Sequence, residues 1–125
     1  MKAMSVLLSS LTVLLIGASG AAVAADLALK KSGGILVDGA GKTVYTFDKD
    51  VANSGKSACN GQCAALWPPV VADGEPAAPY SIVTRDDGSK QLAYKGKPLY
   101  LYSADQKPGD RKGDGVKDIW HVVKD

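Results

Sequence analysis

The chain has little of the chemistry from which metal sites are usually built. Its 125 residues include only two cysteines and one histidine, and its two methionines are Met1 and Met4. A structural zinc site needs four ligands, and a soft copper site favours methionine. The sequence therefore predicts no bound metal and no other cofactor.

A large excess of charge of one sign is also lacking. The formal net charge is +2 at pH 7, and acidic and basic residues are interspersed along the chain. There is no basic stripe of the kind that binds nucleic acid, and no acidic tail that suits a cationic partner. No nucleophile elbow and no phosphate-binding glycine loop occurs either. We therefore expect a non-enzymatic protein that does not bind nucleic acid.

Residues 1–24 have the pattern of a secretory signal peptide. A basic start precedes an apolar stretch at residues 6–16, small residues follow, and an A-x-A cleavage site ends at Ala24. The alternative is an uncleaved membrane anchor, because residues 4–25 are long enough to span a bilayer. The small-residue tail and the cleavage site favour export. We expect a signal-peptide helix, then a single periplasmic or secreted domain at residues 25–125 with no membrane span after cleavage.

Beyond that segment the sequence predicts β structure. No stretch shows sustained helical periodicity, and short runs rich in β-branched and aromatic residues alternate with turns. Residues 35–37 and 42–48 flank a glycine-containing turn, which predicts a hairpin. One or two helical turns are possible at residues 58–66, and two prolines confine residues 67–71 to an edge or a connector. Further strands are expected at residues 81–85, 91–94, 98–103 and 118–123, after a lead-in at residues 25–32. The expected class is all-β, a small antiparallel β-meander or sandwich-like domain.

The chain repeats a motif. Residues 41–50 read GKTVYTFDKD, and residues 96–105 read GKPLYLYSAD. A period of about 50 residues is in the range of structural repeats. Two copies are too few for an open array, which would leave bare sheet edges. We therefore expect two tandem repeats, about residues 33–72 and 80–125, packed face to face in a pseudo-two-fold arrangement.

The aromatic residues of the motif are expected in the core. Side chains alternate across a strand, so the two aromatic residues of each copy share one face. They are Tyr45 and Phe47 in the first copy and Tyr100 and Tyr102 in the second. Each ring can bury on the order of 150 Å² or more, so we assign this face to the core or to the seam between the repeats.

The acidic residue of the motif admits two interpretations. Asp50 and Asp105 each follow the second aromatic residue by three positions, where the strand should end. A carboxylate there can accept backbone N–H bonds and fix the turn. The alternative is that the two carboxylates converge on a cation, although no calcium-loop spacing surrounds them.

The two cysteines predict a disulfide. Cys59 and Cys63 are separated by three residues in an exported chain, and they have no other cysteine to pair with. Haem attachment needs C-x-x-C-H, whereas here the spacing is longer and Ala64 follows. A redox-active dithiol and a cluster with His121 are the remaining alternatives. His121 itself is expected as a half-buried strand residue beside Trp120.

The motif resembles a known family. Tyr45-x-Phe47-x-x-Asp50 and its second copy resemble the bacterial secreted repeat family, described as predicted lipoproteins with a Yx(FWY)xxD motif. The segments at residues 59–69 and 105–123 share the resemblance. The family has no settled activity. Because this chain lacks the lipobox cysteine of many relatives, the resemblance does not imply membrane tethering here.

The expected function is therefore that of an exported, non-enzymatic binding or envelope-associated module. Its partner is an unknown protein or small molecule of the envelope, and the sequence predicts no oligomeric state. The association of some relatives with respiratory or redox proteins suggests an alternative, a redox accessory that transfers electrons or binds haem, quinone or metal. The residues expected to act structurally or in binding are Tyr45, Phe47, Asp50, Trp67, Tyr100, Tyr102, Asp105, Trp120 and His121.

Overall fold

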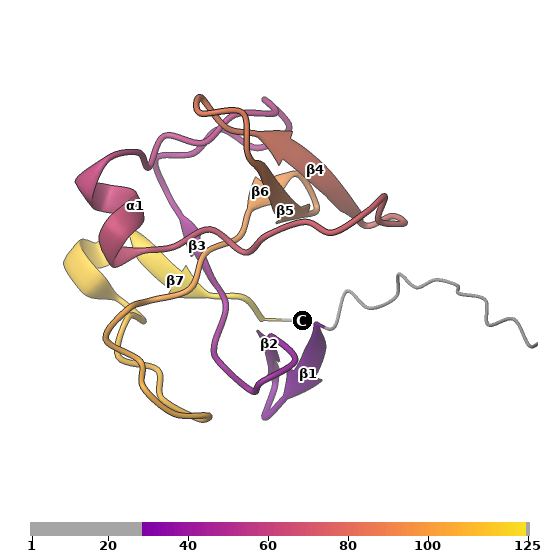
Figure 1. Cartoon of the computed structure of the whole chain (residues 1–125). Helices are drawn as coiled ribbons and strands as arrows, with labels where there is room; N and C mark the ends of the chain where they lie inside the picture. Colours follow the sequence, from indigo (N-terminus) through magenta and orange to yellow (C-terminus); the bar gives the residue numbers. More distant parts are fainter. Residues whose placement is uncertain (1–28, 125) are drawn as a thin grey trace, which may run out of the picture.

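The computed structural model describes residues 29–124. The signal peptide predicted at residues 1–24 lies outside this described part, so it stays a prediction. Within the described residues the chain forms short strands joined by turns, with two short helical segments (Figure 1). The strands are β1 (Lys30–Ser32), β2 (Ile35–Val37), β3 (Tyr45–Phe47), β4 (Tyr80–Thr84), β5 (Lys90–Tyr94), β6 (Lys97–Pro98) and β7 (Trp120–Val122). The helical segments are α1 (Gln62–Leu66) and the 3-10 turn η2 (Val116–Asp118). The predicted all-β class is confirmed.

The strands form small antiparallel sheets. β1 pairs with β2, β3 pairs with β7, and β4, β5 and β6 form a three-stranded sheet in that order. In the β3–β7 pair, Tyr45 lies opposite Val122 and Phe47 lies opposite Trp120. The motif strand of the first repeat is therefore paired with the last strand of the second repeat, which ties the two halves together.

The hairpin predicted for residues 35–37 and 42–48 forms only beside its turn. There Val37 bridges to Thr43, and Val44 N–H donates to the Leu36 carbonyl over 3.1 Å. The ladders form elsewhere, because β2 pairs with β1, in the segment predicted as a lead-in, and β3 pairs with β7. The second edge of β2 is shared between two segments. Val37 bridges to Thr43 on that edge, and Ile35 bridges to Lys124.

Other boundaries are shorter than predicted. The strand expected at residues 98–103 ends at Pro98 as β6, and Tyr100 beyond it makes only isolated bridges, to Tyr45 on one side and Pro69 on the other. Residues 67–71 form no strand of their own and contribute single bridges, as expected for a connector with two prolines. A chain that contacts two neighbours through one residue at a time cannot form a continuous ladder.

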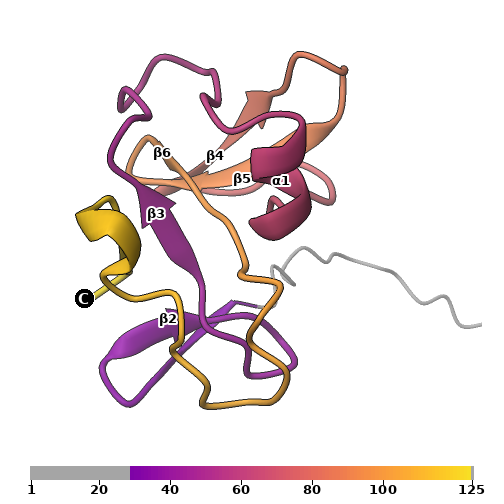
Figure 2. The same ribbon diagram turned by 90° about the vertical axis from the view of Figure 1, so that its left-hand side faces the viewer.

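The pseudo-two-fold centre lies at the two motif tyrosines. Tyr45 N–H donates to the Tyr100 carbonyl over 2.8 Å, and Tyr100 N–H donates to the Tyr45 carbonyl over 2.9 Å. Figure 2 shows β3 in the middle of the molecule, with the chain that follows β6 running beside it. Because equivalent residues of the two repeats exchange equivalent bonds, the repeats face each other as the duplicated motif predicted.

The core has two parts, separated by strands that are buried on both faces. Ile35 and Val37 of β2 point into one cluster, whereas Leu36 between them points into the other. This follows from the alternation of side chains along a strand. The aromatic residues gather in the first cluster, and the second is aliphatic. The first cluster contains Ile35, Val37, Tyr45, Phe47, Cys59, Trp67, Tyr100, Trp120 and Val122.

Candidate functional site

Four aromatic rings form a continuous stack, which we call the four-ring stack. Its order is Phe47, Trp120, Trp67 and Tyr102, so residues of the two repeats alternate along it. The ring centroids lie 4.2 Å apart for Phe47 and Trp120, and 4.0 Å apart for Trp67 and Tyr102. The two indoles in the middle lie 3.7 Å apart with an interplanar angle of 1°. The stack therefore locks the repeats together at their seam.

The motif tyrosines pack against the sides of this stack. Tyr45 meets Trp67 edge-on at 5.4 Å, and Tyr100 meets Trp120 edge-on at 5.2 Å, so each repeat contributes one equivalent contact. Gly113 covers another edge of Trp67, where an added Cβ would lie 2.7 Å from the ring. A side chain at Gly113 would therefore displace the indole.

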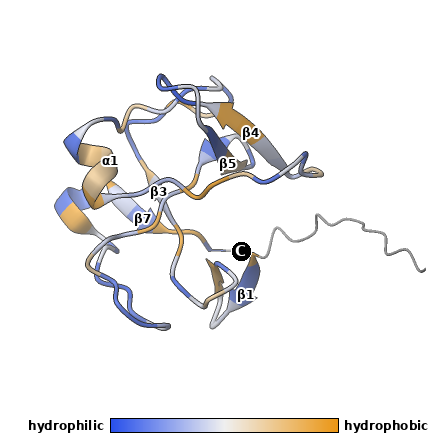
Figure 3. Cartoon of the chain, in the orientation of Figure 1, coloured by the Kyte–Doolittle hydropathy of each residue, from blue (hydrophilic) through white to orange (hydrophobic). Residues whose placement is uncertain are grey.

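An apolar pocket opens beside the four-ring stack. It has a volume of about 350 Å³, and α1 and η2 lie on this side of the molecule (Figures 1 and 2). α1 has no buried residue and is partly coloured as hydrophobic in Figure 3, and its Leu66 is 55% exposed at the pocket. We call this the indole pocket. Its lining residues are Phe47, Cys63, Leu66, Trp67, Tyr102, Val116, Lys117, Ile119 and Trp120.

The rim of the indole pocket at η2 has an unusual backbone. Lys117 and Asp118 have φ angles of 51° and 59°, in the left-handed region that residues other than glycine seldom adopt. Two such residues in succession cost of order 1–3 kcal/mol each, and such conformations cluster at ligand clamps. Lys117 is exposed at the edge of the pocket, on this left-handed segment of backbone.

The motif aspartates bind the tyrosine of the opposite repeat. The Tyr45 hydroxyl donates to Asp105 Oδ2 and the Tyr100 hydroxyl donates to Asp50 Oδ2, each over 2.6 Å. Burial, and then the bonded carboxylate, raise the pKa of both tyrosine hydroxyls well above the ordinary value of 10.0. Each tyrosine thus keeps its proton and donates it across the seam between the repeats.

The second oxygen of each aspartate accepts a backbone bond, as the sequence predicted. Asp50 Oδ1 accepts from Ala58 N–H over 2.6 Å, and Asp105 Oδ1 accepts from Lys112 N–H over 2.9 Å. The cross-repeat bond was missed, since spacing within one repeat does not reveal it. Within residues 29–124 no group of three or more His, Cys, Asp or Glu side chains could hold a metal ion.

A buried arginine, also missed from the sequence, extends the network around Tyr100. Arg85 is 6% exposed and donates to the Ser57 hydroxyl over 3.0 Å and to the Gln91 amide oxygen over 2.7 Å. Ser57 in turn lies 2.6 Å from the Tyr100 hydroxyl. One signal could have found it, because the alternation that points Val83 inward points Arg85 inward as well.

Asp50 contributes a stability component that falls as the pH rises. Burial raises the pKa of Asp50 above 3.8, against the lowering effects of Tyr100, the Ala58 N–H and Arg85. The folded state thus keeps a proton that the unfolded state has lost, and the free energy of unfolding decreases from pH 3.8 upward through the folded-state pKa. We expect the wild type to gain stability relative to Asp50→Asn when urea unfolding is followed from neutral pH downward through that window. If the difference in free energy of unfolding between the wild type and Asp50→Asn is constant, or shrinks on acidification, this prediction is contradicted.

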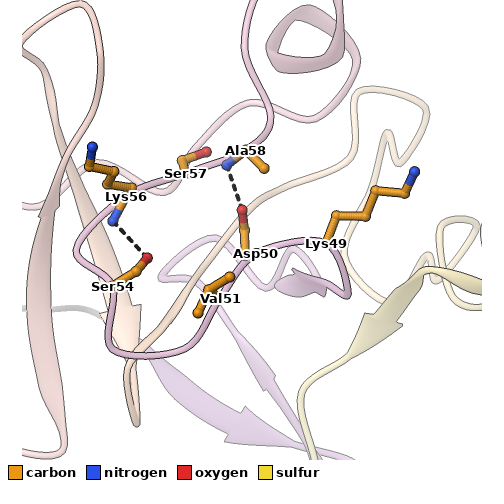
Figure 4. A pocket seen from close by; sticks show the side chains of 7 residues that line it. All are labelled: Lys49, Asp50, Val51, Ser54, Lys56, Ser57 and Ala58. Carbon is orange, nitrogen blue, oxygen red and sulfur yellow. Dashed lines mark hydrogen bonds between the residues drawn. The ribbon is translucent and has the colours of Figure 1, made fainter.

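A second hollow lies beside Asp50, with a volume of about 350 Å³ (Figure 4). The Asp50 carboxylate points toward Ala58 N–H at its wall, and the side chains of Lys49 and Lys56 point away from Asp50. A third hollow, of about 280 Å³, lies between the end of β5 and the end of the chain. It is lined by Thr46, Tyr94, Lys95, Lys97, Val122, Val123 and Lys124.

Cys59 and Cys63 form the predicted disulfide, which is confirmed. Cys59 is fully buried, while Cys63 is partly buried and lines the indole pocket. The bond closes a short loop with a sequence separation of 4, and its second cysteine, Cys63, lies in α1.

Removing this disulfide is expected to lower the free energy of unfolding by about 2 kcal/mol, the loop-entropy value for so short a loop. The wild type in a reducing buffer should unfold at a lower urea concentration than the oxidised wild type. The double variant Cys59→Ala/Cys63→Ala should lose at least as much and should not respond to reductant. An unfolding midpoint that reduction leaves unchanged would contradict a stabilising role.

His121 lies on β7 opposite Thr46 and forms a pair with Asp48. Its Nε2 is 2.8 Å from Asp48 Oδ2, and the two side chains are 43% and 46% exposed. His121 is thus a partly exposed strand residue. It does not line the indole pocket, although its neighbour Trp120 does.

Comparison with known proteins adds one finding. Residues 27–71 and 81–124 each match the model of a family described as a secreted repeat of unknown function. No curated protein and no solved structure matches the chain. In the part of the chain that the structure describes, no helix has the length and apolarity that crossing a membrane requires.

Proposed function

The chain belongs to the family of secreted repeats of unknown function, and from that premise we propose that it is an exported binding module whose ligand site is the indole pocket. The observation that carries the proposal is an apolar pocket lined by aromatic rings from both repeats. Its volume of about 350 Å³ lies within the range of small-molecule sites. Such sites are typically lined by aromatic and aliphatic side chains with few polar groups, as this one is.

The test is binding of a neutral apolar fluorescent probe, N-phenyl-1-naphthylamine, to the folded protein. Leu66→Gln should weaken binding about fivefold, which corresponds to about 1 kcal/mol of lost apolar contact. Val71→Gln is the matched control, since Val71 is 73% exposed and lies outside the pocket. Equal binding by the two variants, or no binding by the wild type, contradicts the proposal.

Export by a cleaved signal peptide is the second part of the proposal. It rests on the secreted character of the family and on the A-x-A site that ends at Ala24. N-terminal sequencing of the protein from its native host should begin at Ala25. An uncleaved chain in the membrane fraction would instead support the anchor alternative.

A second candidate function, a redox accessory protein, is favoured by one specific observation. Cys63 of the disulfide lines the same pocket as the four-ring stack, so a dithiol couple and stacked rings lie side by side. A redox role requires a disulfide that is reduced at moderate potential. Equilibration with mixtures of reduced and oxidised dithiothreitol measures the reduction potential of the disulfide. A potential below about −300 mV, typical of structural disulfides, removes this candidate.

A further inference from the structure

Resting on the proposed binding site, we propose that the indole pocket selects flat apolar molecules that carry an anionic oxygen, with aromatic carboxylates as the simplest class. The proposal depends on three features of the pocket wall: two indole N–H groups without acceptors, ring edges in place of ring faces, and a lysine at the rim.

The two indole N–H groups are the first feature. Trp67 and Trp120 are only 4% and 3% exposed, and neither Nε1–H donates a hydrogen bond to any residue in the range 29–124. In that range no buried side-chain nitrogen or oxygen is left without a partner. Both N–H groups must therefore lie on the small part of each indole that remains accessible. Both indoles line the indole pocket, and the proposal places their N–H groups at its wall.

An indole N–H is a donor and cannot accept a hydrogen bond. The pair of N–H groups therefore favours acceptor atoms on the ligand and disfavours an ammonium group, which can only donate. Because the two indoles are parallel and 3.7 Å apart, their donors come from adjacent layers of one stack. A carboxylate offers two acceptor oxygens, and hydrogen bonds to a charged acceptor are the stronger ones.

The ring edges are the second feature. Each indole has one face on the other indole and its second face on Phe47 or Tyr102. The indoles can thus present only their edges to the pocket. Aromatic edges carry partial positive charge, and they attract oxygen atoms or the face of another ring. A flat aromatic body with an oxygen substituent satisfies both preferences.

Lys117 is the third feature. Among residues 29–124 it is the only charged residue that lines the indole pocket, and it forms no ion pair there. Its backbone lies in the left-handed region. A cation without an ion-pair partner, at the rim of an otherwise uncharged pocket, favours a negative ligand and disfavours a positive one.

The test uses three probes with one ring system: 2-naphthoate, 2-naphthalenemethanol and 2-naphthylmethylammonium. The chain has only two tryptophans, so the two indole N–H signals in an NMR spectrum of ¹⁵N-labelled protein report directly on Trp67 and Trp120. We expect 2-naphthoate to shift both signals and to bind about tenfold more tightly than the ammonium probe. Lys117→Gln should weaken 2-naphthoate binding about fivefold, whereas Lys107→Gln, an exposed lysine outside the pocket, should not.

The outcomes separate this inference from the proposed function. If the three probes bind with equal affinity, or if 2-naphthoate binds while both indole signals stay in place, the pocket is a binding site without the proposed selectivity. If none of the three probes binds while N-phenyl-1-naphthylamine does, only the selectivity inference fails, and if that probe does not bind either, both proposals fail. The same spectra report whether Lys117→Gln is folded, which distinguishes a loss of affinity from unfolding.

Discussion

Tyr45→Ala is expected to lower the free energy of unfolding by about 3–5 kcal/mol, the range of large aromatic truncations in a core. Tyr45 is fully buried at the centre of the pseudo-two-fold arrangement, with its ring against Trp67 and its hydroxyl on Asp105. The substitution leaves a cavity and an unpartnered carboxylate oxygen. Urea unfolding at neutral pH measures the loss.

Tyr45→Phe isolates the hydroxyl from the ring. It should cost about 1–3 kcal/mol, because Asp105 is 3% exposed and water cannot replace the lost donor. Tyr94→Phe is the matched control, since the Tyr94 hydroxyl bonds to nothing in residues 29–124 and the change should stay within about 0.5 kcal/mol. Equal costs for the two variants would falsify the cross-repeat bond as a source of stability. If Tyr45→Ala leaves stability unchanged but abolishes ligand binding, the motif is a binding surface instead.

Trp120→Ala should cost a similar amount, about 3–5 kcal/mol. Trp120 is 3% exposed and lies between Phe47 and Trp67 in the four-ring stack, with Tyr100 against its edge. Its removal interrupts the stack and opens the floor of the indole pocket. Urea unfolding measures the loss, and Val71→Ala, an exposed apolar truncation, should stay within about 0.5 kcal/mol.

A spectroscopic result checks the stack itself. Two parallel indoles 3.7 Å apart couple electronically, so the far-ultraviolet circular dichroism of the wild type should contain an indole couplet. Trp120→Phe and Trp67→Phe should each abolish that couplet while the protein stays folded. A couplet that survives either substitution cannot come from this pair of rings.

The duplicated motif could be recognised from sequence because it uses local rules. Alternation along a strand places Tyr45 and Phe47 on one face, and both residues are buried. The two cysteines had no other partner, and they form the disulfide. Two prolines in residues 67–71 excluded a continuous strand there, and only single bridges occur. Alternation and the exclusion by proline need only neighbouring residues, and the disulfide needs in addition only a count of the cysteines.

Pairing between distant segments was the part that local rules misjudged. Residues 35–37 and 42–48 flank a turn and pair beside it, yet β2 forms its ladder with β1 and β3 forms its ladder with β7. Which strand occupies a free edge depends on all the strands that compete for it. A turn signal reports only on the two segments next to it.

The sequence by itself determined the β character of this chain, its two repeats and the burial of the motif tyrosines, because these follow from local periodicity and from counting. Only the tertiary structure decided that Asp50 bonds to Tyr100 and Asp105 to Tyr45, so that each repeat completes the other. It also decided that Trp67 and Trp120 meet in one stack. Residues some 50 positions apart are brought into contact only when the two halves pack, and spacing within one half cannot encode which partner the other half supplies.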